Sequence, residues 1–306
     1  ELFDTVIALE AGASAAYFMR ADHYAHYLIN SISDPTLSAD DHAAAFAAFN
    51  DNYDAAIQTS SDPAFRNAAA YDQALIAGSW RLLPNLMDKI FADPSCTNPG
   101  WMNQTSITYG RAADMLRKMQ KEIECDPLSF SGYWDASNSL FWLGRFDEAL
   151  DIANEGWRIT HHKNVRNSMV YAYLGTGQLE ELERFVEQEI DDGVYLHAYR
   201  MLLAAVNGDA AGTNRYRQDI ATEKQNTLDL QLLGLAVAGD REGANELAAS
   251  IDEHPYGYLI LMQIPMTCAC GAPFDLEKTP NFARLVEEAN LPWPPESPID
   301  WPLKDW

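Results

Sequence analysis

Residues 133–157 decide the fold class, and they read YWDASNSLFWLGRFDEALDIANEGW. Apolar residues follow a helical spacing as far as Leu143, and Gly144 then interrupts the helix. Glycine readily adopts the positive φ that a tight turn between two helices requires. Asp147 and Glu148 follow in the first turn of the next helix, where the helix dipole favours negative charge. The stretch therefore predicts two helices joined by a short turn.

The same turn signal recurs along the chain. A glycine followed by the start of a second helix occurs at Gly78, Gly110, Gly144, Gly177, Gly208 and Gly239. The successive intervals are 32, 34, 33, 31 and 31 residues, close to the period of repeats that consist of two helices. We therefore expect an all-α protein, a superhelical array of antiparallel helix pairs, with little or no β-sheet.

The unit at residues 133–157 resembles a tetratricopeptide (TPR) repeat. Its segment GRFDEAL, residues 144–150, is similar to the Gly-Asp-Tyr-Asp-Glu-Ala sequence that forms the turn and the start of the second helix in that family. The small residues Ala149, Ala153 and Gly156 are expected where helices of neighbouring units approach each other. The resemblance implies a TPR-like α-solenoid, although the later units keep the turn and lose the aromatic positions.

Three segments are expected from the pattern of helix signals. Residues 1–66 read as divergent helical pairs of the array, residues 67–265 as TPR-like repeats, and residues 266–306 as an extended C-terminal cap with one short helix near 279–289. Residues 291–306 contain five prolines, which exclude a helix there. Their three tryptophans would leave large apolar rings in water, so we expect these rings to pack on the array.

The C-terminal segment carries a second resemblance. Residues 268–282, CACGAPFDLEKTPNF, and 292–306, PWPPESPIDWPLKDW, are similar to the C-terminus of a group of membrane-anchored bacterial regulators. Those proteins combine a cytoplasmic winged-helix or nucleotide-cyclase-like output domain, a membrane span and a TPR region outside the membrane. The resemblance implies that this chain is the periplasmic sensor portion of such a regulator, the cytoplasm being the alternative location. A start at Glu1 rather than Met agrees with a fragment of a larger protein.

Charge limits the partners of the 306-residue chain. Its 45 acidic and 21 basic side chains give a net charge of −24 and a pI of about 4.4. Nucleic acid and anionic lipid surfaces both require positive charge on the protein, so neither is an expected partner. The longest apolar run, Tyr258 to Met266, is far shorter than the ~20 residues of a membrane helix.

The four cysteines leave their redox state open. Cys96 and Cys125 each lie beside an Asp-Pro pair at a separation near one repeat, so they can form a disulfide or remain free thiols. Cys268 and Cys270 are separated by one residue, which makes a poor zinc site. A tight turn with thiols or a strained bridge is the preferred interpretation there.

The sequence contains no recognisable catalytic motif. A Gly-x-Ser-x-Gly motif, a phosphate-binding glycine loop and a His-Glu-x-x-His motif are all missing. His23 and His26 share one helical face, but no third metal ligand can be identified. We therefore expect no cofactor, no metal and no enzyme activity, with a helical-array enzyme that uses cleft carboxylates as a remaining alternative.

The remaining candidate is a concave binding groove lined by the first helix of each pair. Counting back from the turn glycines places in it Trp134, Asn138, Phe141, Trp142, Asn167 and Tyr171, and Arg166 and Arg200 lie beside this row. The asparagines suit main-chain or carboxylate groups of a peptide, and the arginines suit a carboxylate. The aromatic residues have an alternative role as core between helices. The first hypothesis is a sensor or interaction domain that binds a peptide, a partner protein or a small ligand, and the second is an oligomerisation scaffold such as a homodimer.

Overall fold

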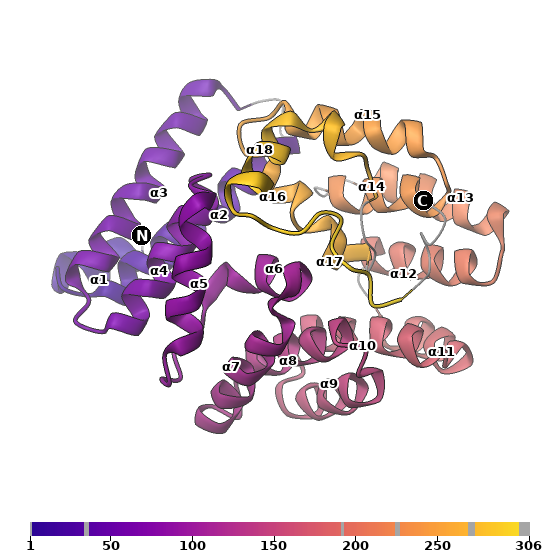
Figure 1. Ribbon diagram of the computed structural model, residues 1–306, viewed down its shortest axis with the longest axis horizontal. Coiled ribbons are helices and arrows are strands. Elements are labelled where there is room, and N and C mark those ends of the chain that lie inside the picture. Colours follow the sequence, from indigo (N-terminus) through magenta and orange to yellow (C-terminus); the bar gives the residue numbers. More distant parts are fainter. Residues whose placement is uncertain (1, 34–36, 191–192, 224–226, 269–272, 300–306) are drawn as a thin grey trace. The chain divides into compact units, whose positions relative to one another are not determined.

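The computed structural model describes residues 2–33, 37–190, 193–223, 227–268 and 273–299. Within these residues all regular secondary structure is helical and no strand is present, which confirms the all-α prediction (Figure 1). The chain forms two compact units. Unit 1 contains residues 1–102, 251–260 and 281–291, and unit 2 contains residues 103–250, 261–280 and 292–306. These divisions do not follow the expected boundaries at residues 66 and 265.

The turns between paired helices share one backbone geometry. All six predicted turn glycines have positive φ, from 69° at Gly78 to 91° at Gly110. At Gly144, the N–H of Gly144 donates to the oxygen of Phe141, and the N–H of Arg145 donates to the oxygen of Leu140, both at 2.9 Å. This pair of hydrogen bonds defines a Schellman motif. The same two bonds recur at Gly78, Gly177, Gly208 and Gly239, so the chain reverses direction at these points through the same turn geometry.

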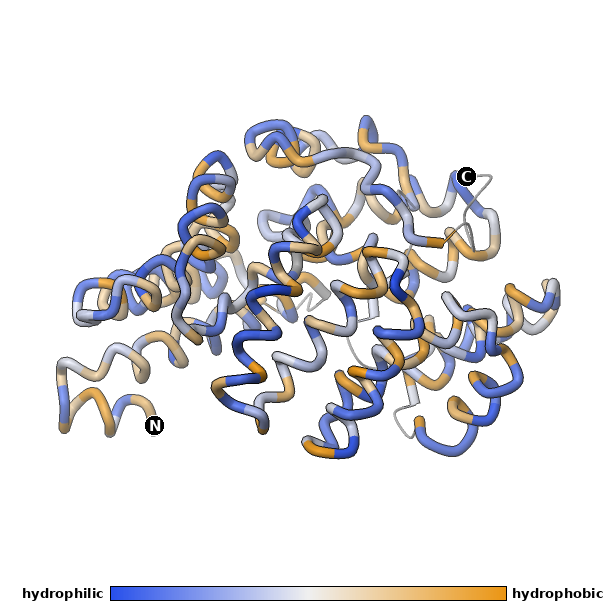
Figure 2. The backbone as a smooth tube through the Cα atoms, turned by 60° about the horizontal axis from the view of Figure 1, so that its bottom comes forward, coloured by the Kyte–Doolittle hydropathy of each residue, from blue (hydrophilic) through white to orange (hydrophobic). Residues whose placement is uncertain are grey.

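Unit 2 is built mainly from successive helix pairs. It begins with α6 (Asn103–Ser106), a kinked segment (Ile107–Arg111) and α7 (Ala112–Cys125). The pairs are α8 (Phe130–Trp142) with α9 (Phe146–Thr160), α10 (Lys163–Thr176) with α11 (Leu179–Glu189), α12 (Gly193–Val206) with α13 (Ala210–Thr222), and α14 (Leu228–Val237) with α15 (Arg241–Asp252). Helix α10 packs on both α8 and α9, so adjacent pairs share a continuous apolar core. Figure 2 shows hydrophobic and hydrophilic residues interspersed along the helices of the chain.

Small residues allow close helix packing in unit 2. Ala149 and Ala153 on α9 are fully buried. A Cβ atom added to Gly156 would lie 2.4 Å from the Cβ of Tyr133. Because Tyr133 belongs to α8, this approach occurs within one helix pair rather than between neighbouring units, which corrects the expected role of Gly156.

Unit 1 combines N-terminal helices with two later segments. Its helices are α1 (Leu2–Leu9), α2 (Ser14–Asn30), α3 (Ala39–Thr59), α4 (Pro63–Ile76) and α5 (Leu83–Ala92), joined by α18 (Pro280–Glu288). The fully buried ring of Trp80 makes edge contacts with Tyr258 and Phe282. The Tyr258 hydroxyl donates to the oxygen of Ile76. The return of these late residues explains why unit 1 is discontinuous in sequence.

The C-terminal segment is only partly extended. It contains α17 (Ile264–Cys268), a 3₁₀ turn (Leu276–Lys278) and α18, whose bounds agree with the short helix expected near 279–289. The Asp252 carboxylate accepts hydrogen bonds from the N–H groups of Asn281 and Phe282, both at 2.8 Å, and so caps α18 from a distant part of the chain. The Trp293 ring packs on Phe274. Trp301 and Trp306 lie outside the described residues.

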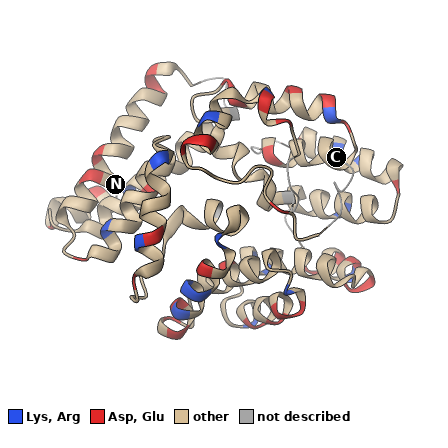
Figure 3. Cartoon of the chain, in the orientation of Figure 1, with Lys and Arg blue, Asp and Glu red and all other residues tan. Residues whose placement is uncertain are grey.

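The first turn of α9 contains Asp147 and Glu148, and that of α11 contains Glu180 and Glu181. Figure 3 shows acidic residues on many of the helices. None of the helices described is both long and apolar enough to cross a membrane. Cys96 and Cys125 are both disulfide-bonded, which resolves the choice left open for them. Cys270 lies outside the described residues.

Candidate functional site

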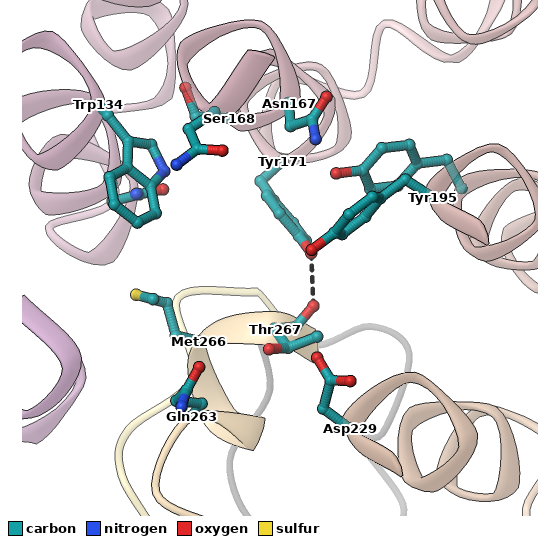
Figure 4. Close-up of a pocket in the computed structure, with 12 residues that line it drawn as sticks. Trp134, Asn167, Ser168, Tyr171, Tyr195, Asp229, Gln263, Met266 and Thr267 are labelled. Atoms are coloured by element: carbon teal, nitrogen blue, oxygen red, sulfur yellow. Dashed lines mark hydrogen bonds between the residues drawn. The ribbon is translucent and has the colours of Figure 1, made fainter. Parts of the chain in front are cut away.

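Unit 2 contains a pocket of about 210 Å³ between its first helices and α17 (Figure 4). Twelve residues line it: Trp134, Asn138, Asn164, Asn167, Ser168, Tyr171, Tyr195, Tyr199, Asp229, Gln263, Met266 and Thr267. Figure 4 shows Trp134 and Ser168 opposite Gln263 and Met266. The volume is below the roughly 300–1,000 Å³ of pockets for drug-sized molecules, so it suits a small ligand or one chemical group.

Helical spacing brings these side chains to one surface. Residues three, four or seven positions apart share a helix face. Trp134 and Asn138 have this relation on α8, Asn167 and Tyr171 on α10, and Tyr195 and Tyr199 on α12. The first helices of successive pairs therefore present corresponding positions to the same cavity.

Tyr171 joins the helix pairs to α17. Its hydroxyl donates a hydrogen bond to the main-chain oxygen of Thr267 at 2.5 Å. Its ring also contacts the rings of Phe141 and Tyr199, and burial raises the pKa of its hydroxyl far above the usual value. Tyr171 therefore stays a neutral donor, and it holds α17 as one wall of the pocket.

The side-chain oxygen of Asn167 is an unused acceptor. It is buried, and no described donor reaches it. Most buried polar atoms in proteins have a hydrogen-bond partner, so such an exception calls for a physical reason. Asn167 lines the pocket, and a half-turn of its amide exchanges the oxygen and the nitrogen, so a ligand donor in the pocket is one partner that this oxygen can take.

Asp229 brings a carboxylate to the pocket wall. Burial raises the pKa of this carboxyl, while hydrogen bonds from the main-chain N–H groups of Leu230 and Asp229 act in the opposite direction. Among the described residues, no lysine or arginine forms an ion pair with it. The pocket therefore contains an acidic group whose charge is not compensated by a described cation.

Four of the eight predicted groove residues meet in this pocket: Trp134, Asn138, Asn167 and Tyr171. The other four do not line it. Phe141 is buried in the core between Phe146 and Tyr171, and Trp142 is half-buried with its ring against Phe141. The alternative role of these two aromatic residues, as core between helices, is the one the structure shows.

The two arginines expected in the groove have other partners. Arg166 is buried, donates to the main-chain oxygen of Glu189 at 2.6 Å, and lies over the ring of Trp157. Arg200 donates through two nitrogens to the carboxylate of Glu187, both at 2.6 Å. Protein oxygens therefore bind both guanidinium groups, and neither arginine lines the pocket.

Sequence reasoning missed Asp229, although a signal was present. Trp134, Asn167 and Asp229 each stand ten residues before the turn glycine of their pair, which is Gly144, Gly177 or Gly239. Asp229 was overlooked because its pair lacks the aromatic residues of the clearer units. No local signal predicts that Gln263, Met266 and Thr267 pack against helices so far back in the chain.

Other clusters of polar side chains are less suited to ligand chemistry. His26 pairs with Asp22 at 3.4 Å, and the described residues hold no group of three metal-ligating side chains. Asp72 in unit 1 and Asp135 in unit 2 are both raised in pKa by burial. They are also almost fully inaccessible, so their hydrogen bonds to Trp101 and Asn103 are structural.

Comparison with known proteins gives no family assignment. No model of a known protein family matches the chain, and no curated protein is similar to it. The pocket geometry is therefore the basis for a functional proposal.

Proposed function

We propose that this chain is a non-catalytic sensor domain that binds a small ligand, or one group of a peptide, in the pocket of unit 2. The observation that carries the proposal is a cavity lined by aromatic, amide and carboxylate side chains from successive first helices, where Asn167 also has a buried oxygen that no described donor reaches. A few well-placed polar groups among aromatic side chains are typical of ligand sites.

A TPR-like solenoid is the architecture that we propose for the helix pairs of unit 2. Three features support it: turn intervals of 31–34 residues, the repeated Schellman turn, and small residues at close helix contacts. Repeat proteins of this kind have an extended concave surface, and the lining of the pocket by residues of α8, α10 and α12 supports the same arrangement here.

We also propose that the domain belongs to a membrane-anchored regulator and lies outside the cytoplasm. The disulfide-bonded state of Cys96 and Cys125 supports an oxidising compartment. A ligand would change the output of such a regulator only if it bound two states of the domain with different affinity. Tyr171 and Thr267 couple α10 to α17 beside the pocket, so their contact is one that ligand binding could favour.

A thermal-shift screen of amino acids, short peptides, sugars and amines tests the proposal. A ligand at one hundred times its Kd stabilises a one-site protein by about 2.7 kcal/mol. We expect at least one class to raise the Tm of the wild-type protein and not that of the Asn167→Leu variant. The absence of any shift, with a Tm that depends on protein concentration, would favour the oligomerisation scaffold instead.

A further inference from the structure

The charge of the pocket indicates the chemistry of its ligand. Of the twelve lining residues, Asp229 is the only one that is ionised at neutral pH in its usual state; the others are tyrosine, asparagine, glutamine, serine, threonine, tryptophan and methionine. Among the residues that the structure describes, no histidine, lysine or arginine lines the cavity. An anion would therefore meet a negative group without compensation, which is strongly unfavourable in a partly buried site.

The nearby arginines do not reverse this charge. Arg166 binds the main-chain oxygen of Glu189 and Arg200 binds the carboxylate of Glu187. Arg217, on α13, lies 3.8 Å from the carboxylate of Asp240. Two of these guanidinium groups are thus hydrogen-bonded and the third is ion-paired to other parts of the protein, and none of the three lines the pocket.

Aromatic faces and a carboxylate favour a cation that carries N–H donors. Trp134, Tyr171, Tyr195 and Tyr199 surround the cavity, and the electron-rich faces of such rings attract ammonium groups. A primary ammonium group has three donors and no acceptor, so it matches a pocket whose one carboxylate, that of Asp229, stands among aromatic side chains.

We propose that the pocket accepts the primary ammonium group of a small amine, with Asp229 as its counter-ion and the aromatic side chains as the surrounding wall. This inference rests on the proposed function, because it names the ligand class of the same pocket. The cavity has a volume of about 210 Å³, which favours a free amine. The ammonium group of a lysine in a peptide is attached to a backbone that would also need space.

Three probes of one shape and different charge test the inference: n-butylammonium, butan-1-ol and butyrate. Saturation-transfer NMR titrations on the intact chain measure the weak affinities expected of such small molecules. We expect n-butylammonium to bind with a Kd at least about tenfold below that of butan-1-ol, which corresponds to about 1.4 kcal/mol, and butyrate to bind most weakly. A capped Gly-Lys-Gly peptide should bind more weakly than n-butylammonium; tighter binding of the peptide would overturn the choice of a free amine.

Two variants assign the effect to the pocket. Asp229→Asn keeps the shape of the side chain and removes its charge, and should abolish the preference for n-butylammonium over butan-1-ol. Glu242→Gln removes one charge from an exposed position in the first turn of α15 and should leave that preference unchanged. Equal loss in both variants would mean that the net charge of the chain, rather than Asp229, attracts the amine.

The result also separates this inference from the proposed function. If butan-1-ol or butyrate binds as tightly as n-butylammonium, and this binding is lost in Asn167→Leu, the pocket is a ligand site and the ammonium inference is wrong. If neither these probes nor the thermal-shift compounds bind, both are wrong.

Discussion

The hydroxyl of Tyr171 and the main-chain oxygen of Thr267 form a hydrogen bond across 96 positions of sequence. This bond holds α17 against α10 and thereby closes one side of the pocket. Removing it leaves the Thr267 oxygen without that donor, at a typical net cost of about 0.5–1.5 kcal/mol. We expect Tyr171→Phe to lower the free energy of unfolding by about this amount and to speed amide hydrogen exchange at residues 264–268. Unchanged exchange there would show that other contacts position α17.

A substitution at Asn167 should weaken ligand binding without lowering the stability of the fold. Replacing it with leucine removes a buried oxygen that no described donor reaches, so the ligand-free protein should be as stable as the wild type or slightly more stable. Ligand binding should nevertheless weaken. Urea unfolding and ligand titration on the same preparations measure the two effects. A clear loss of stability without ligand would mean that Asn167 serves the fold instead of a ligand.

Asp135 should make unit 2 less stable at alkaline pH. Burial raises the pKa of this carboxyl from 3.8 to about 7, so the folded state retains a proton that the unfolded state has already lost. The contribution is complete below about pH 4 and is lost as the pH rises to about 7, amounting to about 4 kcal/mol at most. Asp135→Asn keeps an acceptor for Asn103 and cannot ionise. It should exceed the wild type in unfolding free energy at pH 8 and approach it at pH 5; a constant difference between these pH values would contradict the assignment.

Asp252 should control the docking of α18. It accepts the N–H groups of Asn281 and Phe282 at the start of this helix, and loss of such a cap typically costs about 0.5–2 kcal/mol. We expect Asp252→Ala to lower the unfolding free energy by at least about 1 kcal/mol. The neighbouring Glu253 is exposed, so Glu253→Ala is the matched control and should have little effect. Similar losses in both variants would point to a general charge effect.

Replacing Gly156 with alanine should lower the stability of the protein, the opposite of the usual effect of this substitution in a helix. Alanine normally stabilises a helix interior by about 1 kcal/mol over glycine. Here its Cβ would lie 2.4 Å from the Cβ of Tyr133, and overpacking of this kind costs about 1–3 kcal/mol. We expect Gly156→Ala to be destabilising in urea unfolding. Gly193→Ala, which would meet only the Glu223 side chain at 3.7 Å, should be neutral or stabilising.

Local signals in the sequence predicted the helix pairs well. The turn glycines mark the reversals because positive φ is inexpensive only for glycine, and counting back from them places Trp134, Asn138, Asn167 and Tyr171 on one surface. The same count reaches Asp229, ten residues before Gly239. The partners of the arginines could not be predicted from local signals. Arg200 and its partner Glu187, for example, lie on different helices.

Long-range packing was beyond the reach of these local signals. The return of Tyr258 and Phe282 to Trp80, and of Thr267 to Tyr171, depends on tertiary contacts between residues far apart in the chain. No periodicity or turn residue encodes such contacts. For this reason the predicted segment boundaries differ from the two compact units, and one wall of the pocket was missed.

The indole N–H signal of Trp134 offers the most direct test of the pocket as a ligand site. The chain has eight tryptophans, and the signal of Trp134 in a ¹H–¹⁵N spectrum can be assigned by its loss in Trp134→Phe. Titration with n-butylammonium, or with the best compound of the thermal-shift screen, should move this signal in a saturable manner while that of Trp80, buried in unit 1, stays in place. A spectrum in which Trp134 does not respond to any compound that binds the protein would contradict the assignment of this pocket as the ligand site.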